Sequence, residues 1–224
     1  AADICIYQDF MKKAESAELL RESHLGSETQ SIAAYENKIK MEIEALCSKV
    51  SSVNLNNIQI IKDNADKVRV LVSSFPSFDS NYKTLLNTVT SMAKTSFEKF
   101  EKAVKNGDFE ASSKELQQLY ELQQSLSDHL EPETLALYQC GQGFFIKVLE
   151  DSTASTDEYF TKDTINEKDF AEISKVFKTI SSAKDTYNLQ PHIPLETIQQ
   201  VYENLVQKIE NLILKRMSKI EEKL

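Results

Sequence analysis

The chain contains few residues that interrupt helices. Among its 224 residues there are only four glycines and four prolines, and tryptophan is absent. Folds built from many short strands need glycine, proline and asparagine at the tight turns between strands. The composition therefore argues against such folds and predicts the all-α class. Hydrophobic residues make up 41% of the chain and charged residues 27%, which is the balance of a globular protein.

Cysteine and long apolar runs are also scarce. Cys5, Cys47 and Cys140 are widely separated, and none has the Cys-x-x-Cys spacing of a zinc or redox site. Each lies among apolar residues, so we expect buried free thiols in a reducing, cytoplasmic compartment. No run of about 18 apolar residues is present that could span a membrane.

Residues that commonly carry chemistry do not form a known arrangement. His24, His129 and His192 lack the i, i+4 spacing of a helical metal site. The last two lie near predicted helix ends, where the helix dipole favours histidine. No Gly-x-Ser-x-Gly motif occurs, and acidic residues such as Glu115, Glu121 and Glu203 fall on polar helix faces. We therefore predict no catalytic residue, no cofactor and no metal ligand.

The stretch CGQGFF, at 140–145, is the one glycine-rich position. It matches neither the P-loop nor the dinucleotide-binding fingerprint, and no strand precedes it. We interpret Gly141 and Gly143 as small residues that permit a close helix contact, with Phe144, Phe145 and Val148 packing beside them.

The net charge of −9 comes from 35 acidic and 26 basic residues. Nucleic-acid binders usually carry the opposite balance, because their affinity depends on neutralising phosphates. A small basic group on the last helix is interpreted as part of a solvated face; it comprises Lys208, Lys215, Arg216 and Lys219.

Apolar residues recur at spacings of three and four after three starting positions, Leu55, Phe109 and Phe170. These spacings define one face of an α-helix, whereas a strand would need alternation. The predicted buried residues of the second copy are Phe109, Leu116, Leu119, Leu122 and Leu126, and those of the third are Phe170, Ile173, Phe177, Ile180, Ala183 and Tyr187.

A proline and then a tyrosine follow each of these predicted helices. Proline suits the first turn of a new helix and disrupts a helix interior, so Pro76, Pro132 and Pro194 mark chain reversals. Six or eight residues later come Tyr82, Tyr138 and Tyr202, interpreted as core or half-core positions. An aromatic binding stripe along a groove is the alternative interpretation of these tyrosines.

The repeating unit is thus a helical hairpin, and stacked hairpins bury both sides of each helix. We predict one domain over residues 1–224 with about eight helices, either α-solenoid-like or an elongated bundle. The hairpins are expected near 54–105, 108–151 and 168–224, after two further helices at 3–24 and 28–50 that are separated by Leu25, Gly26 and Ser27.

Local signals set the predicted helix boundaries. Asn106 and Gly107 end one helix, and Asp108 caps the next. Asp169 is expected to cap the helix whose first residue is Phe170. Residues 151–157 are predicted to form a polar loop. In this loop the hydroxyl of Ser155 precedes acidic residues, which is typical either of an acid-directed phosphorylation site or of a solvated loop.

The two ends of the sequence suggest a segment of a larger polypeptide. The chain starts at Ala1 without methionine and stops at Leu224 in helical register. The final helix, from Pro194 to Leu224, is predicted to be the longest, and its apolar stripe drifts across the helix surface. Such drift is compatible with a continuing coiled coil or a further hairpin.

These observations favour a non-enzymatic scaffold, spacer or docking segment of an intracellular protein. Its partners would be other proteins or neighbouring domains, and its oligomeric state is left open. Two alternatives remain: a peripheral, lipid-associated helical domain that uses the basic last helix, and an all-α enzyme whose site is assembled across helices.

Overall fold

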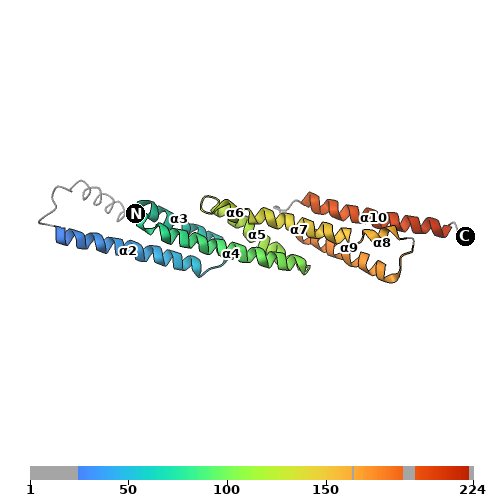
Figure 1. Cartoon of the computed structure of the whole chain (residues 1–224), viewed down its shortest axis with the longest axis horizontal. Helices are drawn as coiled ribbons and strands as arrows, with labels where there is room; N and C mark the ends of the chain where they lie inside the picture. The colour runs from blue at the N-terminus through green and yellow to red at the C-terminus, as the bar shows by residue number, and fades with distance from the viewer. Residues whose placement is uncertain (1–24, 163, 189–194, 222–224) are drawn as a thin grey trace. The chain divides into compact units, whose positions relative to one another are not determined.

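The computed structural model describes residues 25–162, 164–188 and 195–221 (Figure 1). No strand occurs among these residues, and seven of the helices have 17 residues or more, which confirms the all-α prediction. The elements are α2 (Leu25–Ser51), η1 (Leu55–Asn57), α3 (Ile58–Ser74), η2 (Pro76–Phe78), α4 (Asp79–Lys105), α5 (Phe109–Leu126), α6 (Pro132–Leu135), α7 (Leu137–Ala154), α8 (Asp157–Thr161), α9 (Glu167–Tyr187) and α10 (Leu195–Glu221).

These described residues belong to two compact units, which divide within α4 between Met92 and Ala93. The predicted helix at 3–24 lies outside the described residues. The predicted helix at 28–50 is α2, which already begins at Leu25, so the expected stop before residue 28 is wrong. Glycine keeps its backbone N–H and costs a helix only about 1 kcal/mol relative to alanine, so Gly26 alone does not end it.

In the N-terminal unit, α2 packs along α3. The Sγ atom of Cys47 also lies 3.8 Å from the carbonyl oxygen of Asn81, which brings α2 to the beginning of α4. Helical spacing again identifies the core. The buried side chains of this unit include Ile43, Leu46 and Val50 from α2, Ile61, Ala65 and Val68 from α3, and Leu85 and Val89 from α4.

The reversals form where the local sequence predicts them. Gly107 has a φ of +71°, which is the left-handed conformation that ends a helix with a glycine. Asp108 then caps α5, since its carboxylate accepts a hydrogen bond from the amide of Ala111 at 3.0 Å. Pro76 and Pro132 are the first residues of η2 and α6, whereas Pro194 is outside the described residues.

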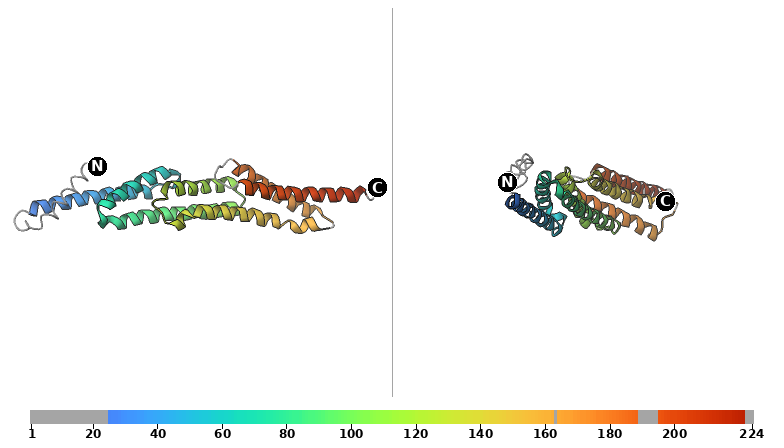
Figure 2. Two further views of the ribbon diagram at one scale, coloured as in Figure 1. Left: turned by 90° about the horizontal axis from the view of Figure 1, so that it is seen from above. Right: turned by 60° about the vertical axis from the view of Figure 1, so that its left-hand side comes forward.

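In the C-terminal unit, α5 packs on α7 and α9, and α10 packs on α9 and α7. Figures 1 and 2 show α9 and α10 side by side and running in opposite directions. Among the described residues, α10 has 27, the same number as α2 and α4. Of the described helices, none is both long and apolar enough to cross a membrane.

Aromatic side chains fill the centre of this unit. The ring of Phe145 lies 4.3 Å from that of Tyr187 and 6.0 Å from that of Phe109, measured between centroids, so one residue of α7 contacts both α9 and α5. The hydroxyl groups of Tyr187 and Ser112 are 2.6 Å apart. Because Ser112 donates to the carbonyl oxygen of Phe109 at 3.1 Å, we assign Tyr187 as the donor in the buried pair.

Burial of Tyr187 gives the C-terminal unit a dependence on alkaline pH. Its pKa is raised above the usual value near 10 because burial disfavours the phenolate; a smaller effect opposes this, because the Ser112 hydroxyl could turn to donate a hydrogen bond to the phenolate. The unfolded chain releases this proton as the pH passes about 10, while the folded chain retains it. The contribution of Tyr187 to stability is therefore fully present below pH 10 and is lost as the pH rises above that value.

We expect the free energy of unfolding to fall by about 1 kcal/mol more in the wild type than in Tyr187→Phe between pH 9 and pH 11. Urea titrations of both proteins at the two pH values measure this difference. Titration of the exposed lysines affects both proteins alike. If the two proteins lost the same free energy of unfolding between these pH values, the pH dependence would not come from Tyr187.

Two features of α7 differ from the predictions. Cys140 is exposed, not buried, because the buried face of α7 follows Tyr138, Gly141, Phe145 and Leu149, and residue 140 lies beside that face. Only one of the two α7 glycines makes a close contact. A Cβ atom on Gly141 would lie 2.8 Å from Cδ1 of Leu116, whereas one on Gly143 would meet nothing within 4 Å.

The predicted loop at 151–157 is also largely helical. Residues 151–154 complete α7, and Asp157 begins α8. The hydroxyls in this stretch bond back to the preceding turn, as Thr153 does to the carbonyl of Leu149 at 2.9 Å. This local bonding lets serine and threonine remain helical. Ser155 is exposed in the short connection between the two helices.

Candidate functional site

Several residues singled out in the sequence have structural roles. Glu115, expected on a solvated face, accepts a hydrogen bond from Ser96 at 2.7 Å and so links α5 to α4. Tyr138 packs on Tyr120 with ring centroids 5.2 Å apart. His129 lies in the turn after α5. Across the described ranges, no three His, Cys, Asp or Glu side chains gather where they could hold a metal ion.

The start of α9 is fixed by a capping box. The side chain of Asn166 accepts hydrogen bonds from the amides of Lys168 and Asp169 at 2.9 and 3.0 Å. Asp169 in turn accepts one from the amide of Asn166 at 3.1 Å. The predicted cap at Asp169 is therefore wrong by three residues. Asp169 occupies the N3 position of the box, where an acidic side chain reaches back to the cap.

A salt bridge reinforces this end of α9. The ammonium group of Lys162 lies 2.9 Å from the carboxylate of Asp169. This hydrogen bond, with the one from the Asn166 amide, holds the pKa of Asp169 below its usual value. Since the folded state favours the carboxylate, its contribution to stability is fully present above its usual pKa and is lost as the pH falls from that value through the lowered pKa of the folded state. The connection before α9 is thereby held against the first turn of the helix.

Phe170, one turn into α9, is 58% exposed, so its predicted burial is wrong. It does lie on the same helical face as Ile173 and Phe177, as the spacing requires. Ile173 is buried and Phe177 is half-buried. Periodicity thus identifies the face correctly, but it cannot say whether a neighbouring helix covers each turn of that face.

The register of α9 against α10 places Phe170 level with Ile209, so its exposed ring lies beside α10 and not beyond the end of that helix. The rings of Phe177 and Tyr202 face each other with centroids 5.7 Å apart. Because the helices are antiparallel, moving ten residues back from Phe177 to Glu167 corresponds to moving ten residues forward from Tyr202 to Leu212. Residues of α10 beyond Leu212 therefore extend past the first residue of α9.

The result is an apolar groove at this end of the two helices, here called the α9–α10 groove. It has two adjoining hollows with volumes of about 420 and 310 Å³, which share Phe170, Leu212 and Ile213. The first hollow is also lined by Ile165, Arg216 and Met217, and the second by Ile173, Phe177, Tyr202, Val206 and Ile209.

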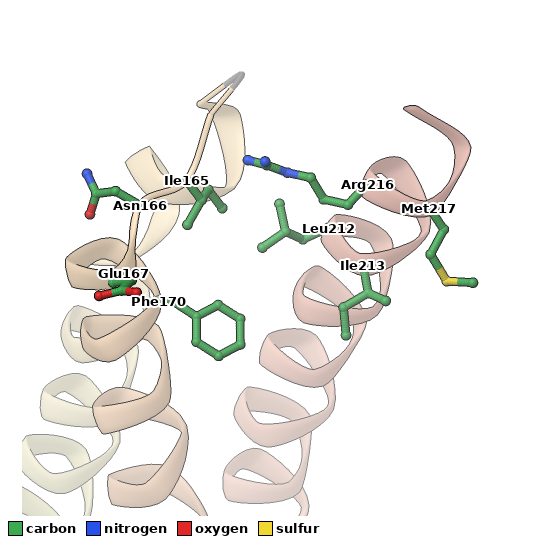
Figure 3. Close-up of a pocket in the computed structure, with 8 residues that line it drawn as sticks. All are labelled: Ile165, Asn166, Glu167, Phe170, Leu212, Ile213, Arg216 and Met217. Carbon is green, nitrogen blue, oxygen red and sulfur yellow. The ribbon is translucent and has the colours of Figure 1, made fainter. Parts of the chain in front are cut away.

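Figure 3 shows the first hollow. Phe170 and Ile165 point from the α9 side toward Leu212 on α10. Arg216 extends from α10 across the hollow toward Ile165, while Met217 lies at the outer edge. The Nη2 atom of Arg216 is buried and has no hydrogen-bond partner in the described part of the chain.

Chemically, this arrangement is suited to binding. Hydrophobic residues form most of the lining, and the polar groups at the first hollow are Asn166, Glu167 and Arg216. Ligand sites of this type combine a mainly apolar surface with a few polar groups that fix orientation.

Of the three tyrosines whose alternative interpretation was a binding stripe along a groove, Tyr202 lines the second hollow, whereas the other residues of the groove were not predicted to form one. The signal that pointed toward it was the drifting stripe at the end of α10, where Ile213 and Met217 leave the face that begins at Ile198. The basic group on α10 was noted, but its members differ. Lys208 forms a salt bridge with Asp157 on α8, whereas Arg216 turns into the groove. Comparison of the chain with family models, curated proteins and solved structures gives no match.

Proposed function

We propose that this chain is a non-enzymatic helical scaffold of the cytoplasm whose α9–α10 groove docks another protein. The exposed apolar surface around the groove is the observation that supports the proposal. Phe170, Ile213, Leu214 and Met217 are all exposed, and three of these four line the first hollow. Clustered apolar surface of this kind is typical of interaction sites, whereas singly exposed apolar residues are common on any protein.

The N-terminal unit provides the contrast. In the part of this unit that the structure describes, the large exposed apolar residues are Tyr35 and Met41 on α2 and Ile60 and Val70 on α3, and none of them lines either hollow of the groove. The cytoplasmic part of the proposal is supported by Cys47 and Cys140, which are both free thiols, since secreted proteins usually pair their cysteines.

Crosslinking from the groove tests this proposal. A photoreactive phenylalanine analogue at position 170, in the full chain expressed in its native cells, is expected to capture a protein that the same analogue at exposed Lys175 does not. The captured protein is then purified and its binding to the unmodified chain is measured. Identical captures from both positions would contradict a docking role for the groove.

Substitution at Met217 should weaken binding of the captured protein without destabilising the chain. Met217 is 54% exposed, and Met217→Ser removes an apolar contact at the edge of the groove. We expect the Kd to rise at least about tenfold, as for a residue that anchors an interface. The matched control is Met41→Ser, because Met41 is 70% exposed and lies in the N-terminal unit. Titration calorimetry gives both Kd values, and equal Kd values would refute the assignment.

A further inference from the structure

The groove specifies the conformation of its occupant, an inference that rests on the proposed docking function. The long walls of the groove are the helices α9 and α10, with Ile165 and Asn166 of the preceding connection at one end, so most backbone N–H and C=O groups along it are bonded within a helix. An extended peptide that lay on this surface would find few backbone partners and would leave its own backbone groups unpaired. A helical peptide carries its backbone hydrogen bonds internally, and helix-in-groove docking requires only apolar anchors from the partner.

The residues around the groove also favour a particular charge on the binding partner. Helices α9 and α10 each contain four basic and four acidic residues, so the chain's net charge of −9 arises outside this helix pair. From Asn211 to Ile220, α10 carries Lys215, Arg216 and Lys219 and no acidic residue. Electrostatic interactions act over about 8 Å at physiological salt. The groove end of α10 is therefore locally positive although the chain as a whole is acidic, and the acidic residue in the lining of the first hollow is Glu167 of α9.

Arg216 carries part of this positive charge, and its side chain brings the charge into the groove. Its side chain reaches across the first hollow, and its Nη2 atom is buried and lacks a hydrogen-bond partner among the described residues. A buried donor without a partner is unfavourable, and a charged donor more so. A carboxylate placed at the hollow would accept a charge-assisted hydrogen bond from the guanidinium group, with the bidentate geometry that arginine favours.

We infer that the α9–α10 groove binds an amphipathic helix whose apolar residues fill the two hollows and whose aspartate or glutamate pairs with Arg216. The apolar anchors recur every three or four residues along the partner, which is the period that places them on one face. The acidic residue belongs at the end of that face that lies over the first hollow. An anionic membrane is less well matched, because the apolar residues line a concave surface and Arg216 turns inward.

The test uses a displayed library of peptides. In the library, leucines are fixed at positions i, i+3, i+7 and i+10, and every other position is alanine, glutamine, glutamate or lysine. Selection on the full chain is expected to enrich glutamate over lysine. The selected peptides should bind the Arg216→Gln protein at least about tenfold more weakly by fluorescence anisotropy. Lys215→Gln, which changes the neighbouring exposed residue, is the matched control and should alter the Kd less than about twofold.

The outcomes separate this inference from the proposed function. If peptides bind in a manner that depends on Met217 but show no enrichment of glutamate and no loss with Arg216→Gln, the acidic partner is refuted while docking at the groove stands. If no peptide is selected but crosslinking at position 170 captures a protein, the helical occupant is refuted. Flotation with phosphatidylserine vesicles that depends on Met217, without any peptide binding, would assign the groove to a membrane and overturn the inference.

Discussion

Replacing Phe145 by alanine is expected to lower the free energy of unfolding of the C-terminal unit by about 3–5 kcal/mol. The side chain of Phe145 is fully buried and joins Phe109 on α5 to Tyr187 on α9. Truncation removes both ring contacts and leaves a cavity that three rigid helices can fill only in part. The loss is comparable to the entire stability of many domains.

Hydrogen exchange during urea titration is the appropriate measurement, because a chain with two units need not unfold in one step. Amides of α5, α7 and α9 should lose protection at lower urea, while those of α2 and α3 should change little. Phe170→Ala is the matched control. The same side chain is removed where it is 58% exposed, and the expected change is within about 0.5 kcal/mol. Equal effects of the two substitutions would show that Phe145 is not central to the core.

The second large effect is expected at Gly141, where a larger side chain would overpack the core instead of leaving a cavity. A Cβ atom at this position would lie 2.8 Å from Cδ1 of Leu116 and 3.4 Å from Cε1 of Phe100. Both neighbours are buried, so they have little room to move. Gly141→Leu should therefore overpack the contact of α7 with α4 and α5 and destabilise the unit by about 3 kcal/mol.

Gly143 provides the control on the same helix, two residues away. It is exposed, and a Cβ atom there would meet nothing within 4 Å. Gly143→Leu should stabilise the helix by up to about 1 kcal/mol, because leucine has a higher helix propensity than glycine. Urea denaturation of both variants gives the comparison. If Gly141→Leu were stabilising instead, α7 would not pack closely on α4 and α5 at this residue.

The sequence predicted helices well because helix formation depends on local patterns. The stripe from Phe109 to Leu126 is buried at all five predicted positions, and Gly107 and Asp108 mark the boundary before it. The cap of α9 was misplaced, because Asn166 and Asp169 both suit helix starts and only the hydrogen bonds distinguish the cap from the N3 residue. Here local propensity gave the element but not its first residue.

The groove depends on how α9 and α10 are placed against each other, and local patterns do not carry that information. Phe170 has the same spacing as the buried start of the second copy, Phe109, but its ring lines the open groove beside α10 and stays exposed. Cys140 likewise lies among apolar residues and still points away from the packed face. Arg216 was one of the four residues in the basic group on the last helix, and the structure alone separates it from Lys208.

The exposed ring at the groove also has a spectroscopic consequence. The chain contains no tryptophan, so Phe170→Trp would introduce a single tryptophan beside both hollows, and this residue can be excited selectively at wavelengths where tyrosine does not absorb. Its emission would be red-shifted in the free chain, because water surrounds a ring at this position, and would shift to the blue when an apolar surface covers it. Occupancy of the groove could then be followed by intrinsic fluorescence in the intact chain, without a label on the partner.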